Sequence, residues 1–377
     1  MADTIAIPRV GILPSGPLNA ITDVAGTSVG HTTLDRGGIQ TGVTVLLPQS
    51  DNLFMQKVPA GLDVINGFGK SVGLMQVQEL GVLESPIALV NTFSVSVAST
   101  ALILDGMALN PELGRSLPTL NPLVFECNDG WLNDARSMSL QTSHVQDALT
   151  AARKVQGAQL FLQGSVGAGR GMSCHGLKGG IGTASRRLLF QGKPYTLGAL
   201  VLANQGRPNA LTLAGQRIGQ PLQALVAKRL CGPTPDVGPE RGSIIMLLAT
   251  DAPLDARQLQ RLARRASAGL ARTGSDYGHG SGDIALAFST AYRVAQLANE
   301  QAPIAPMLHE SAMDLFFQAA AEATEHAIIR ALFSATTVTG RDGHCRFAIT
   351  DLLETAPNLL PNEKTRDSFQ NSSLSRY

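Results

Sequence analysis

The run Ile244–Ala249, IIMLLA, restricts the fold of this chain more than any other segment. It is short and continuous, and the stretch before it, Cys231–Gly242, is dense in proline, glycine and charge. An apolar run between turn signals predicts a strand that is buried on both faces. A sheet with such a strand needs apolar cover on each side, which predicts helices packed against sheets. Gly242 and Ser243, where the loop meets the strand, are ordinary turn residues by themselves.

Other segments fit the same architecture. Apolar patterns predict further strands at Thr41–Pro48, Ser85–Val95, Asn121–Gly130, Leu197–Gly206 and Gly282–Thr290. Helical periodicity predicts helices at Ser143–Val155, with Ser143 as the N-cap, at Asp251–Gly274 and, as a long amphipathic helix, at Met313–Ala335. The mixed order predicts an α/β (α+β) fold, with mixed sheets covered by helices in a single domain of residues 1–377. The polar tail from about residue 354 is predicted to be poorly ordered.

Composition excludes several classes of protein. Of 377 residues, 44% are hydrophobic and 16% charged, which indicates a globular protein with a large core. The net charge is +1 and no basic cluster alternates with aromatic residues, so nucleic acids and anionic membranes are poor partners. We found no signal peptide, and no apolar stretch that approaches the roughly 18–20 residues of a membrane span. We therefore expect a soluble, cytoplasmic protein with a small-molecule or peptide substrate.

Most familiar catalytic motifs are absent. The glycine-rich GSVGAGRGM and GMSCHGLK match neither a dinucleotide fingerprint nor a P-loop. No H-E-x-x-H pattern or paired cysteine–histidine cluster predicts a metal site, and no G-x-S-x-G elbow predicts a serine triad. The four cysteines (Cys127, Cys174, Cys231 and Cys345) form no C-x-x-C pair, so buried free thiols are expected. No metal or organic cofactor is predicted.

One hydrolytic chemistry needs no histidine. An N-terminal serine or threonine can use its own α-amine as the base, and the pKa of that amine is about 7.7–8.0. Ser243 could become N-terminal only if its hydroxyl attacked the carbonyl of Gly242 and the resulting ester were hydrolysed. Glycine suits the position before the serine, because it has no side chain to block the attack.

Five segments together resemble the L-aminopeptidase/D-esterase and β-peptidyl aminopeptidase family, often called DmpA/BapA. They are ITDVAGTSVGHTTL (Ile21–Leu34), ECNDGWLND (Glu126–Asp134), VLANQG (Val201–Gly206), RGSIIMLLATDAPL (Arg241–Leu254) and GSGDIALAFSTA (Gly280–Ala291). The resemblance covers nearly the whole chain in the same order. It implies an αββα sandwich of the N-terminal-nucleophile-hydrolase type, cut by its own serine into fragments 1–242 and 243–377 that stay together. It also implies a homotetramer of such pairs.

The resemblance assigns roles to residues around the nucleophile. It implies that Ser243 is the nucleophile, that Gly242 is left behind by the cleavage, and that Asn204 lines the oxyanion hole. It also implies that Ser281 and Asp283 hydrogen-bond around the nucleophile. Each residue has a plainer alternative: Gly242–Ser243 and Asn204 could form turns, and Asp283 could cap one.

The substrate side is assigned in the same way. The resemblance implies that Glu126 binds the free amino group of the substrate, although a structural arginine would also satisfy this carboxylate. Trp131 is interpreted as a pocket wall. Some relatives carry a tyrosine in this neighbourhood that assists the oxyanion, but Trp131 offers only an indole N–H.

The sequence therefore predicts a self-cleaving serine aminopeptidase with amidase and esterase activity, acting through an acyl-enzyme on Ser243. One alternative is an acyltransferase of the ornithine acetyltransferase type, which relies on a threonine nucleophile. A second is an uncleaved, non-catalytic relative that acts as a binding module. The sequence does not choose among L-, D- and β-amino acids, because one methylene in a pocket changes binding by only about 1–3 kcal/mol.

Overall fold

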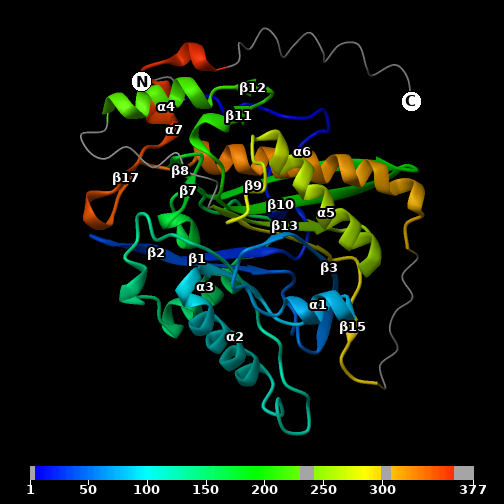
Figure 1. Ribbon diagram of the computed structural model, residues 1–377. Coiled ribbons are helices and arrows are strands. Elements are labelled where there is room, and N and C mark those ends of the chain that lie inside the picture. The colour runs from blue at the N-terminus through cyan, green and yellow to red at the C-terminus, as the bar shows by residue number, and fades with distance from the viewer. Residues whose placement is uncertain (1–4, 156, 230–241, 299–306, 361–377) are drawn as a thin grey trace.

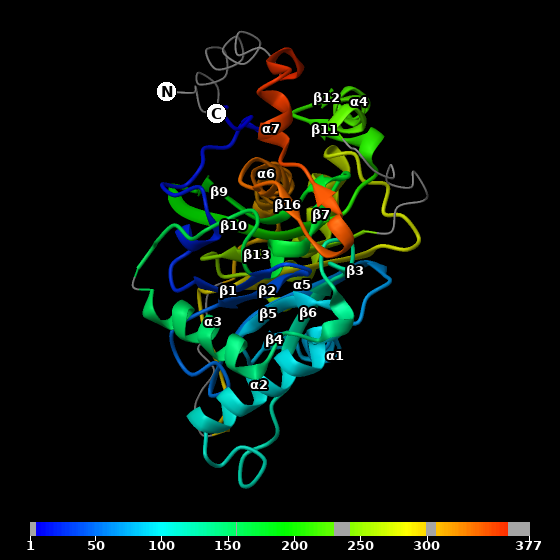
Figure 2. The ribbon, with the colours of Figure 1, turned by 90° about the vertical axis from the view of Figure 1, so that its left-hand side faces the viewer.

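The computed structural model describes residues 5–155, 157–229, 242–298 and 307–360, and these form four layers (Figure 1). Helices α5 (Ala256–Arg272) and α6 (Met313–Phe333) form one outer layer. Helices α2 (Val95–Leu109) and α3 (Thr142–Lys154) form the other. Two sheets lie between them, and the perpendicular view shows the same order of layers (Figure 2). The predicted mixed α/β fold, in its αββα form, is confirmed.

The larger sheet carries most of the predicted central strands. Its order is β15-β3-β14-β13-β10-β9, and β4 pairs with β3 at one side. The smaller sheet has the order β1-β2-β5-β6. The bounds in the larger sheet are β3 (Gln56–Gly67), β4 (Val82–Leu83), β9 (Gly180–Phe190), β10 (Lys193–Asn204), β13 (Ser243–Thr250), β14 (Gly282–Ser289) and β15 (Val294–Ala295). Those in the smaller sheet are β1 (Ser28–Arg36), β2 (Ile39–Leu47), β5 (Ile87–Asn91) and β6 (Leu123–Cys127).

The remaining helices and short strands lie around these layers. They are α1 (Leu74–Leu80), α4 (Gly219–Arg229), α7 (Ile349–Leu353), β7 (Ser173–Cys174), β8 (Leu177–Lys178), β11 (Thr212–Leu213), β12 (Gln216–Arg217), β16 (Val338–Thr339) and β17 (Cys345–Arg346). The pairs β7–β8 and β16–β17 form small antiparallel ladders.

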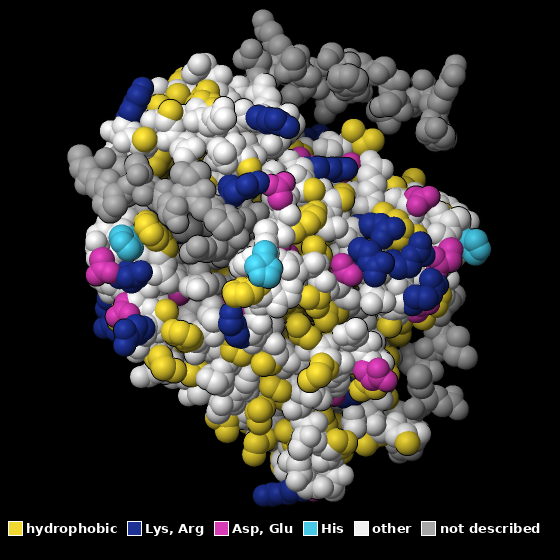
Figure 3. All heavy atoms as spheres, in the orientation of Figure 1, with side chains coloured by type: hydrophobic (Ala, Val, Ile, Leu, Met, Phe, Trp, Pro, Cys, Tyr) yellow, Lys and Arg dark blue, Asp and Glu magenta, His cyan; other side chains and the backbone are white. Residues whose placement is uncertain are grey.

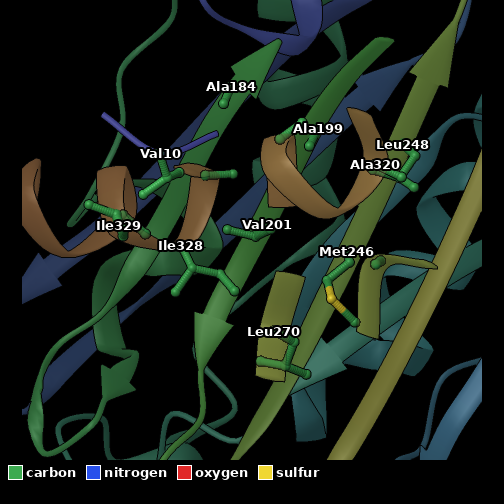
Figure 4. Close-up of a cluster of buried hydrophobic side chains, with 14 of the residues drawn as sticks. Val10, Ala184, Ala199, Val201, Met246, Leu248, Leu270, Ala320, Ile328 and Ile329 are labelled. Atoms are coloured by element: carbon green, nitrogen blue, oxygen red, sulfur yellow. The ribbon is translucent and has the colours of Figure 1, made fainter. Parts of the chain in front are cut away.

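Strand β13 is buried on both faces, as its sequence predicts. Ile244, Met246 and Leu248 belong to the core between the larger sheet and helices α5 and α6. Figure 4 shows Met246 and Leu248 in this core with Leu270 of α5 and Ile328 of α6. The alternate residues Ile245, Leu247 and Ala249 belong to the core between the two sheets. A period of two thus divides one strand between two hydrophobic cores.

Helix α5 lies within its predicted range of Asp251–Gly274 but begins only at Ala256. The side chain of Asp255 caps it by accepting a hydrogen bond from Gln258 N at 2.7 Å. Its solvent face carries Arg257, Arg261, Arg264 and Arg265, and a group of basic side chains is visible on that side of the surface (Figure 3). Arg257 and Arg261 pair with Glu310, and Arg264 pairs with Asp63. Acidic partners therefore offset much of the charge on this face.

Helix α6 differs from its prediction. It was expected to be amphipathic, but every residue from Ala319 to Ile329 is buried. It packs against β9, β10 and α5. The N-terminal segment also contacts it, because the backbone N–H groups of Ile12 and Leu13 donate to the Glu322 carboxylate. Within the helix layer, the buried Arg186 guanidinium also donates to Glu322, at 3.1 Å. Glu322 of α6 is thus satisfied by protein donors rather than by water.

The predicted strand Ser85–Val95 is shorter in the structure, and the helix after it was not predicted. Strand β5 ends at Asn91, whose side chain accepts from Phe93 N at 3.0 Å and starts a turn into α2. The stretch Thr92–Leu109 has a mean hydropathy of 1.5 and the length of a membrane span, which corrects the expectation that no stretch approaches one. It is 39% buried, and one such helix is weak support for a membrane span, because core helices pass the same test.

Two smaller predictions also change. Helix α3 begins at Thr142 with Gln141 as the N-cap, so Ser143 lies inside the helix. Residues 354–360, placed by the sequence in a poorly ordered tail, include a short 3-10 helix at Pro357–Leu359. Leu359 and Leu360 pack against the core, which explains the difference. The rest of the tail, and most of the Cys231–Gly242 loop, lie outside the described residues.

Candidate functional site

Ser243 lies at the first position of β13, between two neighbouring strand ends. It is the cross-strand partner of Asn204 on β10 and of Gly282 on β14. Its Oγ accepts a hydrogen bond from Gly282 N at 3.4 Å. By strand alternation Ser243 and Asn204 face the same side as Ile245 and Leu202, toward the smaller sheet. Directly paired residues have Cβ atoms about 4.5–5.5 Å apart, so the hydroxyl and the amide are close neighbours.

The side-chain amide of Asn204 is held at both ends. Its Oδ1 accepts from Ser173 N at 2.8 Å, and its Nδ2 donates to Asn128 O at 3.1 Å. The first contact comes from β7, and the second crosses from the end of β6 in the smaller sheet. An amide has two N–H donors, so one remains to serve a ligand in a fixed direction. Asn204 is the last residue of β10, just before Gly206 with its positive φ, so the oxyanion role stays a prediction.

Ser281 and Asp283 form a pair, as predicted. The Ser281 hydroxyl donates to Asp283 Oδ1 at 2.6 Å, and both residues are fully buried. They flank Gly282, whose N–H donates to Ser243 Oγ. Asp283 is paired in register with Ile244 and alternates with Ala285, so its side chain lies on the helix side of the sheet. The carboxylate and the Ser243 hydroxyl are therefore on opposite faces, and a contact with Ser243 would be made through its nitrogen.

A bulge shapes the strand beside this pair. In the ladder between β14 and β3, Asp283 pairs with Asn66 and the next residue, Ile284, pairs with Val64. The register shift leaves one residue of β3 unpaired beside Asp283. Bulges of this kind are over-represented next to active sites, where they redirect a side chain.

Glu126 is a buried carboxylate at the end of β6. Its Oε1 accepts from Lys70 N at 2.8 Å, and Thr92 Oγ1 donates to its Oε2. No ion pair joins Glu126 to a basic side chain among the residues that the structure describes, so the alternative of a structural arginine finds no support. Gly69 lies between Glu126 and Gly282, because a Cβ on Gly69 would be 3.4 Å from Glu126 Oε1 and one on Gly282 would be 3.4 Å from Gly69 Cα. Glu126 therefore lies near the start of β14.

Trp131 is fixed by residues from the C-terminal part of the chain. Its ring stacks on His344 at 4.2 Å between centroids, and the Arg346 guanidinium lies 4.3 Å from the ring centroid. Arg346 Nε also donates to Ser173 Oγ at 3.1 Å, which links Trp131 to the residue that holds Asn204. The indole Nε1 is buried without a hydrogen-bond partner in the described part of the chain. Trp131 is thus connected through Arg346 to Ser173, and its role as a pocket wall stays a prediction.

Gly242 is the one residue of the predicted cleavage loop that the structure describes. A Cβ at this position would be 2.6 Å from Gln205 Cα and closer still to the carbonyl oxygen of Asn204. Backbone atoms cannot give way as a flexible side chain can, so this position has no room for a side chain. The sequence predicted glycine here for access to the carbonyl, and the structure adds this steric reason.

Two buried charged residues near Asn204 were not singled out by the sequence. Lys178 is fully buried, and burial lowers the pKa of its ammonium well below the usual value. Asp129 is also buried, and burial raises the pKa of its carboxyl to about 6. Asp129 lies in the ECNDGWLND segment and Lys178 in GMSCHGLK, but no periodicity marks either as buried, because burial depends on neighbours that the fold supplies.

Cys127 behaves as a structural residue. It is fully buried, and burial together with the nearby carboxylates of Glu126 and Asp283 raises the pKa of its thiol well above the usual value. A thiol that stays protonated is a poor nucleophile. Cys127, Cys174 and Cys345 form no disulfide in the described part of the chain. Cys127 and Cys174 are buried, as expected, Cys345 is only partly buried, and Cys231 lies outside the described residues. In the described ranges no three His, Cys, Asp or Glu side chains are grouped so as to hold a metal ion.

Comparison with known proteins shows which family has this sequence and fold. The model of peptidase family S58 matches residues 19–346. The β-peptidyl aminopeptidase BapA of Sphingosinicella microcystinivorans is 36% identical over 358 residues, which span 91% of this chain and 88% of the relative.

Two solved structures agree with this match. A β-aminopeptidase from Burkholderia sp. is 38% identical, with a TM-score of 0.83, and the match covers 94% of this chain and 98% of that chain. The L-aminopeptidase D-Ala-esterase/amidase of Ochrobactrum anthropi, described as a variant of the Ntn hydrolase fold, is 32% identical. Its TM-score is 0.80 over 94% of this chain and 98% of that chain. The chain therefore belongs to peptidase family S58 and is a serine aminopeptidase with a fold of the Ntn-hydrolase type.

Proposed function

We propose that Ser243 is the nucleophile of this aminopeptidase and that it becomes N-terminal when the chain cuts itself after Gly242. The observation that carries the proposal is the direct pairing of Ser243 with Asn204, whose amide is fixed at both ends. A hydroxyl and a fixed amide donor on one face are what acyl transfer needs for attack and for the oxyanion. In the described part of the chain, no hydrogen bond joins a histidine to Ser243.

The cleavage follows from the same geometry. The Ser243 hydroxyl adds to the carbonyl carbon of Gly242, the C–N bond breaks, and the nitrogen takes a proton. Water then hydrolyses the ester, which leaves a carboxylate on Gly242 and a free amine and hydroxyl on Ser243. Burial and close packing hold Gly242 and Ser243 in one arrangement before the reaction, which reduces the entropy lost on attack.

In turnover the amine of Ser243 acts as the base. It takes the proton of its own hydroxyl as the oxygen attacks the substrate carbonyl, and it returns the proton to the leaving amine or alcohol. The free N–H of Asn204 stabilises the negative charge that develops on the carbonyl oxygen. Water then attacks the acyl-enzyme by the same route in reverse. Asp283, which accepts from Ser281 and is paired with Ile244, is proposed to orient the amine of Ser243 from the helix side of the sheet and to set its pKa.

Glu126 is proposed to bind the free ammonium of the substrate. A buried carboxylate without a basic partner is costly, and a bound ammonium would compensate its charge. Lys70 N and Thr92 Oγ1 already orient its two oxygens. The names of the relatives cover β-peptides, L-amino acids and D-alanine esters, so we propose small N-terminal residues on short peptides, amides and esters as the substrate class.

The cleavage gives the direct test. Purified protein run on a denaturing gel should show two chains, of 242 and 135 residues, because 377 − 242 = 135. Mass analysis of the smaller chain should show Ser-Ile-Ile-Met at its start. Ser243→Ala should remain a single chain and be inactive, whereas Asp35→Asn, an exposed change on β1, should cleave normally. A single full-length band from active wild-type protein would overturn the proposed mechanism.

We also propose that cleaved pairs assemble into homotetramers in the cytoplasm. Around α2 the side chains of Phe93, Leu104, Met107 and Leu109 are each about half exposed, which is unusual for large apolar residues on one helix. Cys127, Cys174 and Cys345 form no disulfide among the described residues, which fits a reducing compartment. Light scattering after gel filtration measures the assembly, and Met107→Glu should shift it toward smaller species if α2 is part of the contact.

A further inference from the structure

Lys178 occupies an unusual place for a lysine. Its side chain is fully buried, and its ammonium donates to three backbone carbonyls: Gly169 O at 2.8 Å, Met172 O at 2.9 Å and Gly179 O at 3.0 Å. An ammonium has three donors and no acceptor, so these three contacts use all of them. Burial opposes the charge, and a methionine would fill similar space at a lower desolvation cost. Filling space therefore does not explain the residue.

The three carbonyls surround the segment that holds Asn204. Gly169 and Met172 lie in the glycine-rich stretch before β7, and Met172 O also accepts from Gly179 N at 3.0 Å. The residue after Met172 is Ser173, whose N–H donates to Asn204 Oδ1. Ser173 is the ladder partner of Lys178 in the β7–β8 pair. Met172 O and Ser173 N belong to one peptide group, so the ammonium holds the same peptide that orients the Asn204 amide.

The second hydrogen bond of the Asn204 side chain is from its Nδ2 to Asn128 O, next to the buried Asp129. The negative charge of Asp129 favours the protonated form of Lys178, and the positive charge of Lys178 favours the ionised form of Asp129. Asp129 is itself held by Asn133 Nδ2 at 3.1 Å. Each of the two segments that hold the amide is therefore next to a buried ionisable residue.

We propose that Lys178 is a positioning residue for the oxyanion site: it holds Gly169–Ser173 so that the free N–H of Asn204 points at the reacting carbonyl. The inference rests on the proposed role of Asn204. Oxyanion stabilisation depends steeply on donor direction, so a small movement of Ser173 lowers the rate of the chemical step more than it weakens substrate binding. Lys178 acts through Ser173 and Asn204 and does not touch the substrate.

A double-mutant cycle tests this inference. Lys178→Met, Asn204→Ala and the double variant are compared with wild type on an aminoacyl p-nitroanilide, and kcat is expressed per cleaved chain from mass analysis. Asn204→Ala should lose about 10²–10³ in kcat. Lys178→Met should lose at least tenfold in kcat with KM within about twofold. The double variant should lose no more than Asn204→Ala alone, because both changes remove the same function.

Lys57→Met is the matched control. Lys57 is also a buried lysine, with Glu84 as its partner, and none of its contacts is with a site residue. Its variant should be destabilised but should keep kcat within about twofold. If Lys178→Met does not fold, Lys178→Gln keeps two donors and should show a smaller loss in kcat at unchanged KM.

The outcomes separate the two proposals. Wild-type kcat in Lys178→Met, or in Lys178→Gln where only that variant folds, would overturn the role of Lys178. The role of Lys178 would also be overturned if the fold-losses in kcat of Lys178→Met and Asn204→Ala multiplied in the double variant. An unchanged kcat in Asn204→Ala would instead overturn the proposed oxyanion role of Asn204, whatever Lys178 does.

Discussion

At the residue scale, the candidate site combines side chains from both faces of the larger sheet. Ser243 and Asn204 face the smaller sheet, whereas Asp283 faces the helices on the other side of the same strands. A carboxylate on the far face cannot reach the Ser243 hydroxyl along the strand, but it can act on a free amine at the strand end. We therefore propose that the Ser243 hydroxyl attacks on one face of the sheet, while Asp283 sets the pKa of the Ser243 amine from the other face.

This division predicts the effect of Asp283→Asn on pH dependence. A nearby carboxylate favours the ammonium form and raises the pKa of the Ser243 amine, so its removal should lower that pKa. The rising limb of kcat/KM against pH should then move toward acid, with a lower maximum. Profiles measured on cleaved protein, with Asp35→Asn as the exposed control, provide the check. A limb that stays in place would mean that Asp283 does not act on the base.

At the element scale, the start of β13 is packed against the end of β10 with no spare room. Gly242 lies against the backbone of Asn204 and Gln205, one residue before the proposed nucleophile. The same contact brings the Gly242–Ser243 peptide next to the Asn204 amide. Strand pairing and the proposed cleavage chemistry thus depend on one close approach of two backbones.

Gly242→Ala should therefore slow self-cleavage. The added methyl must move backbone atoms, and overpacking of this kind typically costs 1–3 kcal/mol. We expect cleavage about tenfold slower or more in a time course after cell-free synthesis, followed on denaturing gels. Gly38→Ala is the matched control, because its Cβ would meet Arg341 only at an ordinary 3.5 Å. Equal cleavage rates for the two variants would contradict the steric argument.

At the scale of the whole molecule, burial of two histidines makes stability depend on pH. Burial lowers the pKa of His31 to about 4 and that of His326, which also lies near Arg186 and Arg330, to about 3. Both values lie below the ordinary 6.5, so between pH 6.5 and about 4 the folded state binds fewer protons than the unfolded state. Stability from these residues is therefore lost as pH falls through that window. Asp129, with a raised pKa of about 6, acts in the opposite sense below pH 6.

Burial also raises the pKa of Asp251 and Glu325, which act in the same sense as Asp129, so the contribution of one histidine is tested by removing it. His326→Asn keeps an acceptor for Arg186 and removes one titrating group. Between pH 6.5 and 4.5 it should reduce the slope of the free energy of unfolding against pH by about 1.4 kcal/mol per pH unit, the value for one proton. Urea denaturation at several pH values measures the slope. The exposed His309→Asn should leave it unchanged, and an equal effect of the two substitutions would contradict this assignment.

The sequence by itself determined the elements whose signals are local. The apolar run of β13, the capped and one-sided helix α5 and the strands β2, β6, β10 and β14 lie close to their predicted positions, because periodicity and caps act over a few residues. It also indicated Ser243, Asn204, Glu126, Ser281 and Asp283 as candidate site residues, since each belongs to a short segment that resembles the family. These residues could be named without knowing where their side chains would meet.

Tertiary structure decided the rest, because the deciding contacts join residues far apart in the chain. Helix α6 is buried on every side by strands and an N-terminal segment that its own sequence does not contain. Asn204 is oriented by Ser173, 31 residues away, and by Asn128, 76 residues away. Lys178 looks like an ordinary surface lysine in sequence, and only the fold surrounds its ammonium with carbonyls. Local patterns carry no information on such partners, so the support around the site became visible only in three dimensions.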